Sequence, residues 1–443
     1  SKNKVRFNFK SNTNRELPLI VGQLPVLPKH YWKDKIFEDT SLDIPIGSGP
    51  YKIEKFDAGR SISYKLNHNY WGKNIPIKKG TDNFDVIRYE YYKDRSIERE
   101  SFKAGNIDLF SENTSKDWAT SYNIPIVKNG LIKKELIEHE NPQGMQAFVF
   151  NIRKEIFKDK RVRKALSYAF DFEWTNKNLF YDAYKRTNSF FENSELASSG
   201  LPTEKELEYL NAYRDILPKE IFTKQYNPPK TDGSGYMRLE LQKAATLLKD
   251  SGWILDNGIL KNKISSKQFK FEILLVSPAF ERIVLPFIDN LKKLGIIANV
   301  RTIDSAQYQS RLDSFDFDMI VATFSQSLSP GNEQRNFWSS DAANTNGSRN
   351  LIGIKDNVVD ILIEKIISSK NREDLINSTK TLDRVLLWGH YVIPQWHISA
   401  YRTLYWDIFN KPNNKPKYSL GTNTWWVDPE KYSLINKTKK SNK

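Results

Sequence analysis

Short runs that alternate apolar and polar side chains predict the strands of this chain. Residues 51–56 and 62–66 both alternate in this way, and a turn at 57–60 that contains Gly59 separates them. Such a pair predicts a β-hairpin. The same alternation predicts further strands at residues 5–10, 84–92, 107–110 and 146–151.

Longer runs with apolar residues three or four positions apart predict helices. Val162, Leu166 and Ala169 share one helical face, and Asp159 stands where it can cap the helix N-terminus. Beyond residue 238, predicted helices and strands alternate, so the chain is expected to be an α/β protein with mixed sheets. The predicted helices are 239–252, 280–294, 305–312, 358–368 and 372–387, and the strands are 271–276, 297–301 and 317–322.

The composition excludes several classes of chemistry. The 443 residues include no cysteine, so disulfides, thiolate nucleophiles and cysteine-bound metals are excluded. Lysine and arginine exceed aspartate and glutamate by 15. The basic residues are scattered, whereas a nucleic-acid binder needs a clustered stripe, so we expect no nucleic-acid partner.

No catalytic motif is present. The sequence has no nucleophile elbow, no HExxH, no P-loop and no GxGxxG. Of its five histidines, His390 and His397 are seven residues apart, but Pro394 between them prevents one shared helical face. We therefore expect no enzyme activity, no metal site and no cofactor.

Four strings resemble the extracellular solute-binding proteins of family 5, the peptide- and nickel-binding components of bacterial ABC importers. They are Gly47-Ser48-Gly49-Pro50-Tyr51, Asn69-Tyr70-Trp71-Gly72, the stretch 102–108 (FKAGNID) and the stretch 157–166 (FKDKRVRKAL). The resemblance implies a two-lobed periplasmic binding protein of the cluster with an extra domain. Its task would be to capture a solute between the lobes and deliver it to ABC permease subunits.

The resemblance also implies a division of the chain. Residues 29–140 and 398–443 would form the first lobe, and residues 141–397 the second, inserted lobe. Residues 1–28 would be a remnant of an amino-terminal lobe, because family members carry such a lobe and a signal peptide before the Gly47–Tyr51 turn. We therefore expect a truncated fragment or a split reading frame. The resemblance also implies that the protein is periplasmic, and we expect a monomer.

The expected binding site follows the strand at 317–322. In peptide-binding members of the family, the loop after this strand carries an aromatic residue and, three residues later, an aspartate that pairs with the ligand's α-ammonium group. Phe324 matches the aromatic residue, but Ser327 stands at the place of the aspartate. A serine cannot replace a charge-assisted bond worth roughly 1.5–3 kcal/mol. Either Glu333 substitutes, or the ligand lacks a free ammonium group.

Longer strings resemble one subfamily, the Yej-type periplasmic proteins that bind oligopeptides and microcin C. They are residues 174–181, 184–196, 327–335 and 386–397. The resemblance implies oligopeptide or modified-peptide ligands, including peptides with a formylated end. The strings do not specify one ligand.

Other candidate ligand contacts lie on expected loops. Ser325, Gln326 and Asn332 offer neutral hydrogen-bonding groups to a peptide backbone, and Arg186 and Arg335 suit a carboxylate or phosphate. Trp396 and His397 are expected on the site's wall. For each arginine a surface ion pair is the alternative, and Trp388 is expected in the core. A peptide-holding, chaperone-like module and a degenerate fragment of the importer component remain the alternative functions.

Overall fold

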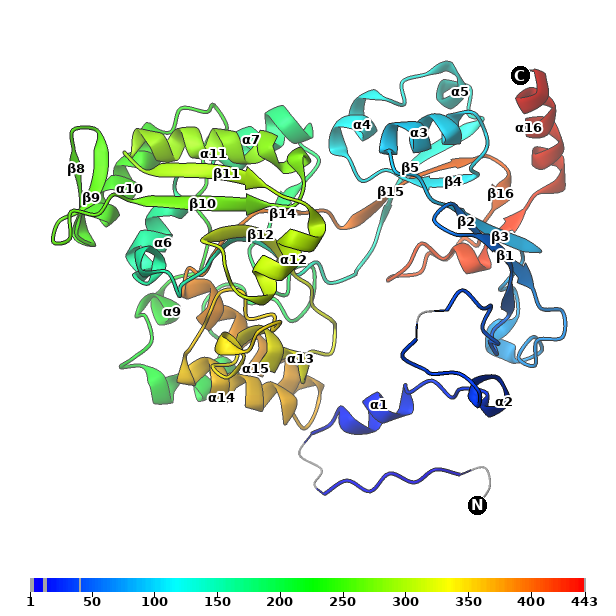
Figure 1. The fold of residues 1–443 in the computed structure, drawn as a ribbon, viewed down its shortest axis with the longest axis horizontal. Helices are drawn as coiled ribbons and strands as arrows, with labels where there is room; N and C mark the ends of the chain where they lie inside the picture. The colour runs from blue at the N-terminus through cyan, green and yellow to red at the C-terminus, as the bar shows by residue number, and fades with distance from the viewer. Residues whose placement is uncertain (1–3, 11–13, 40, 442–443) are drawn as a thin grey trace. The chain divides into compact units, whose positions relative to one another are not determined.

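The computed structural model describes residues 4–10, 14–39 and 41–441, and its chain divides into two compact units. The first unit comprises the opening segment up to Gln23 together with Pro142–Ile398. The second comprises Leu24–Asn141 and Ser399–Lys443. The architecture is α/β with mixed sheets, as the sequence pattern predicts (Figure 1).

A five-stranded mixed sheet organises the first unit, in the order β11-β10-β12-β6-β13. Strand β10 runs parallel to β11 and β12, whereas β6 is antiparallel to both β12 and β13. Its strands are β6 (Met145–Phe150), β10 (Lys270–Leu275), β11 (Ile297–Thr302), β12 (Met319–Phe324) and β13 (Val392–Pro394).

Helices cover both faces of this sheet, because successive side chains of a strand point to opposite faces. Met145 and Val149 of β6 join one hydrophobic cluster, and Phe148 and Phe150 join the other. The first cluster includes residues of α13 (Glu333–Trp338), α14 (Asn357–Ile367) and α15 (Arg372–Trp388). The second includes residues of α6 (Lys160–Ser167), α7 (Phe172–Phe180), α10 (Arg238–Asp250) and α11 (Glu281–Lys293).

Shorter elements complete the first unit. The ribbon of β7 and β14 is antiparallel, and so is the hairpin of β8 and β9. These elements are α1 (Leu17–Gly22), β7 (Lys185–Arg186), α8 (Glu204–Leu210), α9 (Glu220–Thr223), β8 (Trp253–Asp256), β9 (Ile259–Asn262), α12 (Ser305–Asp313) and β14 (Trp396–His397).

The second unit contains two three-stranded sheets and a small ribbon. The predicted hairpin forms, with β1 antiparallel to β2 and β3 on the other side of β2. In the second sheet β15 pairs with β4 and β5, and β16 pairs with β17. The strands are β1 (Tyr51–Asp57), β2 (Ser61–Leu66), β3 (Val86–Glu90), β4 (Leu109–Ser111), β5 (Ile132–Glu138), β15 (Ala400–Trp406), β16 (Phe409–Asn410) and β17 (Trp426–Val427), and the α-helices are α2 (Lys29–Trp32), α3 (Arg95–Lys103), α4 (Ser115–Thr120), α5 (Pro125–Lys128) and α16 (Pro429–Ser441).

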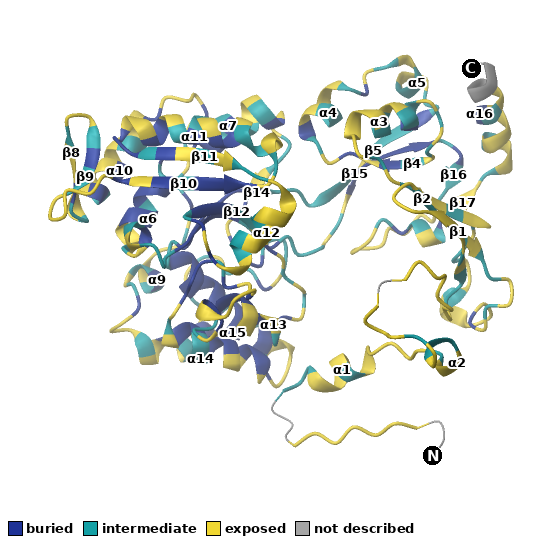
Figure 2. Ribbon diagram, in the orientation of Figure 1, coloured by how far each residue is buried: buried dark blue, intermediate teal, exposed yellow. Residues whose placement is uncertain are grey.

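The buried residues are distributed unevenly along the chain (Figure 2). The sheet and helices of the first unit hold most of them, whereas no hydrophobic residue before Phe102 is buried in the described part of the chain. The predicted strand at residues 5–10 was wrong. These residues form no strand and lie exposed, because no neighbouring strand pairs with them.

The predicted helix after Asp159 is confirmed at its N-terminus and on its buried face. Asp159 Oδ1 accepts a hydrogen bond of 2.8 Å from the Arg161 amide, so the carboxylate caps the helix. Val162 and Leu166 are buried in the second cluster, and so is Ala169, which lies beyond the end of the helix at Ser167. No helix in the described parts of the chain is both long and apolar enough to cross a membrane.

Candidate functional site

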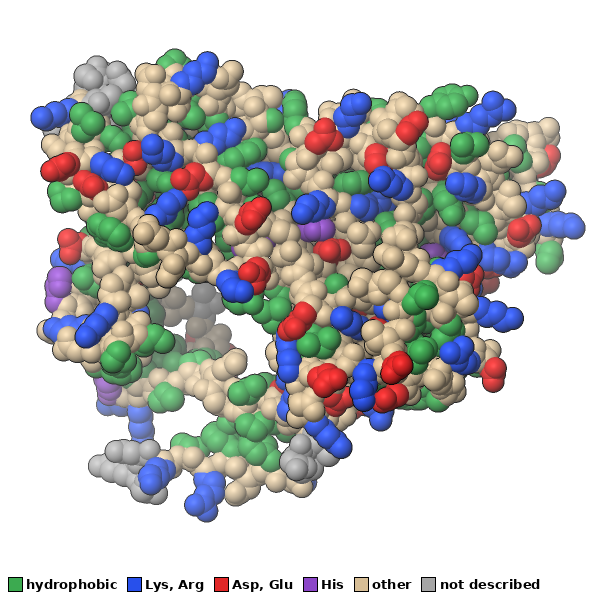
Figure 3. All heavy atoms as spheres, turned by 180° about the vertical axis from the view of Figure 1, so that it is seen from behind, with side chains coloured by type: hydrophobic (Ala, Val, Ile, Leu, Met, Phe, Trp, Pro, Cys, Tyr) green, Lys and Arg blue, Asp and Glu red, His purple; other side chains and the backbone are tan. Residues whose placement is uncertain are grey.

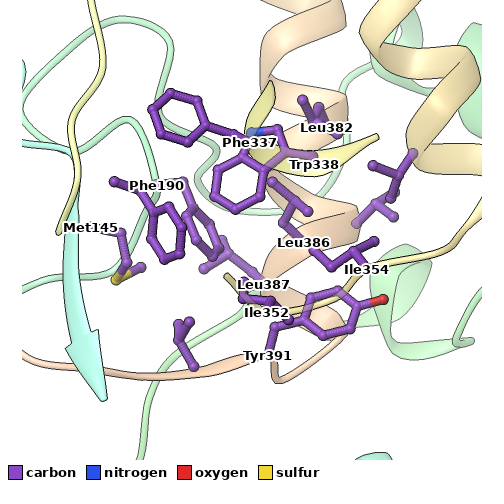
Figure 4. Close-up of a cluster of buried hydrophobic side chains, with 14 of the residues drawn as sticks. Met145, Phe190, Phe337, Trp338, Ile352, Ile354, Leu382, Leu386, Leu387 and Tyr391 are labelled. Atoms are coloured by element: carbon purple, nitrogen blue, oxygen red, sulfur yellow. The ribbon is translucent and has the colours of Figure 1, made fainter. Parts of the chain in front are cut away.

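The candidate loop, residues 325–332, connects the end of β12 to α13. Phe324, the last residue of β12, is only 1% exposed. Its ring centroid lies 4.7 Å from that of Trp338 and 6.0 Å from that of Phe190. Figure 4 shows Phe190, Phe337 and Trp338 of this cluster beside Met145. Phe324 therefore anchors the start of the loop in the core and turns its ring away from solvent.

The first residues of the loop offer neutral polar groups. Ser325 and Ser327 are exposed, and Ser327 Oγ accepts a hydrogen bond of 3.1 Å from the Ser329 amide. Gln326 Oε1 accepts one of 2.7 Å from Gln334. The Gln326 Nε2 group is buried and has no hydrogen-bond partner among the described residues. Buried donors are usually paired, so this one distinguishes Gln326 from the other polar groups of the loop.

Gly144 brings the start of β6 directly against this loop. Its φ is +64°, and an added Cβ atom would lie 2.2 Å from the Phe324 carbonyl oxygen. Only glycine avoids both the left-handed strain and this contact. Gly144 therefore lies beside the start of the candidate loop.

Two of the charged residues predicted for the site, Glu333 and Arg335, already have hydrogen-bond partners. Both carboxylate oxygens of Glu333 accept from the Gly331 amide, at 3.0 and 3.1 Å, and Oε1 also accepts from Gln334 at 2.9 Å. Arg335 makes two hydrogen bonds to Glu364, from Nε at 2.7 Å and from Nη2 at 2.6 Å, and its Nη1 donates to Asn332 at 3.1 Å. Glu333 therefore holds the end of the loop, and Arg335 joins α13 to α14.

A second group of predicted residues lies on the β7–β14 ribbon, where Arg186 pairs with Trp396 and Lys185 with His397. The candidate loop and the β7–β14 ribbon both follow strands that end on the same side of the five-stranded sheet. Phe324 at the end of β12 pairs with Met145, and Pro394 at the end of β13 pairs with Ala147 on the same end of β6.

Trp396 packs inside an aromatic cluster rather than standing free. Its ring centroid lies 4.5 Å from Phe180, 6.0 Å from Tyr184 and 5.8 Å from Phe280, with the Phe280 ring stacked on it. His397 Nδ1 shares a hydrogen bond of 3.2 Å with Thr187 Oγ1. Burial lowers the pKa of His397, with Glu192 acting against that effect and Lys185 adding to it. His397 is therefore neutral at pH 7.

Gln395, between β13 and β14, adds a polar group that the sequence prediction did not include. Its side chain is fully buried, and its Oε1 accepts a hydrogen bond of 2.9 Å from Gln146. Its Nε2 has no partner among the described residues. The Gln146 partner belongs to β6 and pairs with Thr323 of β12, two residues before the loop begins at Ser325.

Arg186 is an unusual buried cation. Its Nε, Nη1 and Nη2 atoms are buried and have no hydrogen-bond acceptor in the described structure. The guanidinium carbon lies 5.1 Å from the Phe170 ring centre and 5.2 Å from that of Phe172. Burial lowers the pKa of Arg186 to about 10, while Glu173, Tyr226 and Asp171 raise it. The arginine remains charged at neutral pH.

Three residues that the sequence prediction missed contact the candidate loop from the opening segment. Asn14, Arg15 and Glu16 all hydrogen-bond to residues 329–332. More than 300 positions separate the partners, and no motif marks the three residues as loop contacts.

The remaining sequence predictions fall as follows. Trp388 is buried in the first cluster, as expected for a core residue. Among the described residues, no group of three or more His, Cys, Asp or Glu side chains is placed to hold a metal ion. The arrangement offers amide and hydroxyl groups on a rigid sheet edge, suited to hydrogen-bonding a polar ligand.

Comparison with known proteins shows similarity of this sequence to one family of binding proteins. The model for bacterial extracellular solute-binding proteins, family 5 (middle region), matches residues 1–346. The uncharacterized protein y4wM of Sinorhizobium fredii is 45% identical over 434 residues, which cover 95% of this chain and 65% of that protein. The probable peptide-binding protein YejA of Agrobacterium fabrum is 42% identical over 432 residues, 95% of this chain and 70% of the relative.

Solved structures share the fold at low sequence identity. The oligopeptide-binding protein AppA from Bacillus subtilis, in complex with a nonapeptide, superposes with a TM-score of 0.66 at 20% identity. The match covers 91% of this chain and 72% of AppA. This chain therefore spans about two thirds of the length of such relatives.

Proposed function

The chain belongs to the bacterial extracellular solute-binding proteins of family 5, and from that premise we propose that it is the substrate-binding component of an ABC importer. Its ligands are oligopeptides or peptide-derived compounds, captured outside the cytoplasmic membrane, in the periplasm, and delivered to permease subunits. The family and the fold are those of binding proteins rather than enzymes. The protein acts as a monomer in this proposal.

The observation that carries the peptide proposal is the loop at residues 325–332. It stands on a rigid sheet edge, presents Ser325, Gln326 and Ser327, and has an unpartnered amide donor at Gln326 Nε2. Peptide backbones offer carbonyl and amide groups that such side chains can bind without a net charge. Phe324 supports the loop from within the core.

The ligand's amino end is blocked, for example by a formyl group as in microcin C. Support comes from the carboxylates near Ser327. Glu333 already accepts hydrogen bonds from Gly331 and Gln334, and Glu16 accepts them from Asn332. Both carboxylates are therefore already engaged in hydrogen bonds within the protein. Arg186 and Arg335 are then available only for anionic parts of a ligand, and Arg335 would first have to leave Glu364.

The division inferred from the resemblance is part of the same proposal. Residues 29–140 and 398–443 form the first lobe in this proposal, and residues 141–397 form the second. Binding then follows closure of lobes over the ligand.

Calorimetric titration with tri-alanine and N-formyl-tri-alanine tests this function. We expect the unchanged protein to bind the formylated peptide more tightly. Ser327→Asp should strengthen binding of tri-alanine by about tenfold or more, because a charge-assisted hydrogen bond contributes roughly 1.5–3 kcal/mol. Ser325→Asp adds the same charge two residues away and serves as the matched control.

Equal gains in both variants would mean that general charge, rather than the Ser327 position, decides the preference. If the unchanged chain binds neither peptide, the transport function of this chain fails, and a peptide-holding module or a degenerate fragment becomes the better account.

A further inference from the structure

The opening segment is hydrogen-bonded to the candidate loop through three consecutive residues. Asn14 and Asn332 exchange two side-chain hydrogen bonds, of 2.8 and 3.2 Å. Arg15 donates from Nη1 to Ser329 Oγ at 2.9 Å and from Nη2 to the Pro330 carbonyl at 2.6 Å. These contacts cover the second half of the loop.

Glu16 makes the charge-assisted part of this contact. Its Oε2 accepts from the Asn332 amide at 2.7 Å and from Asn332 Nδ2 at 3.0 Å. Hydrogen bonds to a carboxylate are about twice as strong as bonds between neutral groups. Glu16 thereby fixes both the backbone and the side chain of Asn332.

Gly331 provides the space for the Glu16 carboxylate. A Cβ atom at this position would lie 1.7 Å from Glu16 Oε2 and 1.9 Å from Cδ. Gly331 does not have a positive φ, so the requirement is for space and not for backbone freedom. The loop and the carboxylate are therefore complementary in shape as well as in hydrogen bonding.

No described residue of the opening segment is fully buried. Helix α1, which follows Glu16 directly, buries no residue, and its Leu19 and Ile20 are exposed. The opening segment ends at Gln23, seven residues after Glu16, and the chain then continues into the second unit at Leu24. The hydrogen bonds of residues 14–16 are thus the main attachment between the loop and a segment that leads into the second unit.

We propose that Arg15 and Glu16 are positioning residues that hold the 329–332 loop in its ligand-binding conformation, so that this contact and ligand binding strengthen each other. The inference rests on the proposed function of the loop. Linkage requires the coupling to be mutual: a contact that favours the binding conformation is itself favoured when ligand is bound. The two side chains act through the loop and do not touch the ligand.

The first test is ligand affinity, measured by calorimetry with N-formyl-tri-alanine and tri-alanine. We expect Glu16→Ala and Gly331→Ala each to weaken binding by about fivefold or more, a typical size for such coupling. Both substitutions disrupt the same contact between Glu16 and the loop. The double variant should therefore bind about as weakly as whichever single variant has the lower affinity. Replacement of the exposed Glu38 by alanine is the control for loss of one negative charge, and it should leave affinity unchanged.

The second test needs no ligand. Hydrogen exchange at the Asn332 amide should accelerate in Glu16→Ala, because its acceptor is lost, and should stay slow in Glu16→Gln, which keeps an acceptor oxygen. Exchange in strand β12 should not change, which separates loss of positioning from loss of the fold.

The outcomes distinguish the two proposals. If the unchanged chain binds neither peptide, the proposed function fails for this chain, and exchange at Asn332 alone decides whether Glu16 positions the loop. If peptide binds but Glu16→Ala and Gly331→Ala bind as tightly as the unchanged chain, the positioning role is overturned. A loss of affinity with unchanged exchange at Asn332 also overturns it, because Glu16 would then contact the ligand directly.

Discussion

His390 is a neutral histidine held beside three cations. Its ring lies tilted against that of Tyr226 and edge-on to that of Trp388, at centroid distances of 5.9 and 6.0 Å. Burial is the main cause that lowers its pKa to about 3, and the charges of Lys164, Arg163 and Lys160 contribute to the same shift. The backbone at His390 has a φ of 49°, and Arg163 donates to its carbonyl oxygen at 3.1 Å.

This environment predicts a loss of stability in mild acid. The pKa of His390 in the folded protein lies below the ordinary value of 6.5. Between these two pKa values the unfolded chain binds a proton at His390 that the folded protein does not bind. The contribution of His390 to the free energy of unfolding is therefore fully present above pH 6.5, and it is lost as the pH falls toward 3. His390→Asn, which tolerates a positive φ, should reduce the loss between pH 7 and pH 5 by about 1–2 kcal/mol.

Urea unfolding of both proteins at pH 7, 6 and 5 measures the difference. Comparison with the unchanged chain cancels other titrating groups, including Asp383. Parallel pH profiles would contradict the prediction and would mean that His390 becomes protonated in the folded protein.

At the scale of elements, helix α15 holds an irregular segment through two adjacent charged residues. Asp383 is fully buried and accepts four hydrogen bonds: from Ser189 Oγ, the Phe190 amide, the Ser198 amide and Ser198 Oγ, at 2.6–2.9 Å. Arg384 makes a buried ion pair of 2.8 Å with Glu206. Together they attach the chain between β7 and α8 to α15.

Asp383→Ala should therefore destabilise the protein by roughly 3–5 kcal/mol, because it leaves several buried donors without an acceptor. Glu208→Ala, which breaks the exposed pair of Glu208 with Lys205, should cost less than about 1 kcal/mol. Both values come from chemical denaturation at pH 7. Similar costs for the two variants would contradict the assignment of Asp383 as the anchor.

The elements of the first unit were largely predictable because each has a local signal. The strands β10, β11 and β12 and the helix α11 between β10 and β11 follow from periodicity within the sequence. Residues 5–10 show why such a signal is insufficient: the alternation is present, but a strand needs a pairing partner.

The candidate site was predictable only in part. The loop was found because it follows a strand and matches a family pattern, yet the sequence could not show that Phe324 points into the core. The partners of Arg335 and Glu333, and the contact of Glu16 with Asn332, depend on residues brought together by tertiary folding. No spacing rule in a single sequence reports contacts of that kind.

At the scale of the whole molecule, the net charge of +15 does not mark one binding face. In Figure 3, lysine and arginine side chains are interspersed with aspartate and glutamate over the visible surface. This distribution agrees with the interpretation of the basic excess as dispersed surface charge.

The two units differ in how much apolar surface they bury. The first has two hydrophobic clusters on the two faces of one sheet, whereas the second has one small cluster that includes Phe102, Phe110 and Trp406. Strand β1 contains no buried residue, and Tyr89 of β3 is exposed. Because stability rises with the apolar area removed from water, the units should unfold separately.

We therefore expect residues 142–398, produced alone, to fold cooperatively, and the intact chain to unfold in two steps with the second unit first. All five strands of the large sheet lie inside this range, so producing residues 142–398 alone keeps every strand pairing of that sheet. The range lacks Glu16, so the Asn332 amide should exchange faster in the isolated unit than in the intact chain, while β12 stays protected. Calorimetry and hydrogen exchange on both proteins check this. A single transition in the intact chain, together with an unfolded 142–398 fragment, would mean that the two units depend on each other for stability.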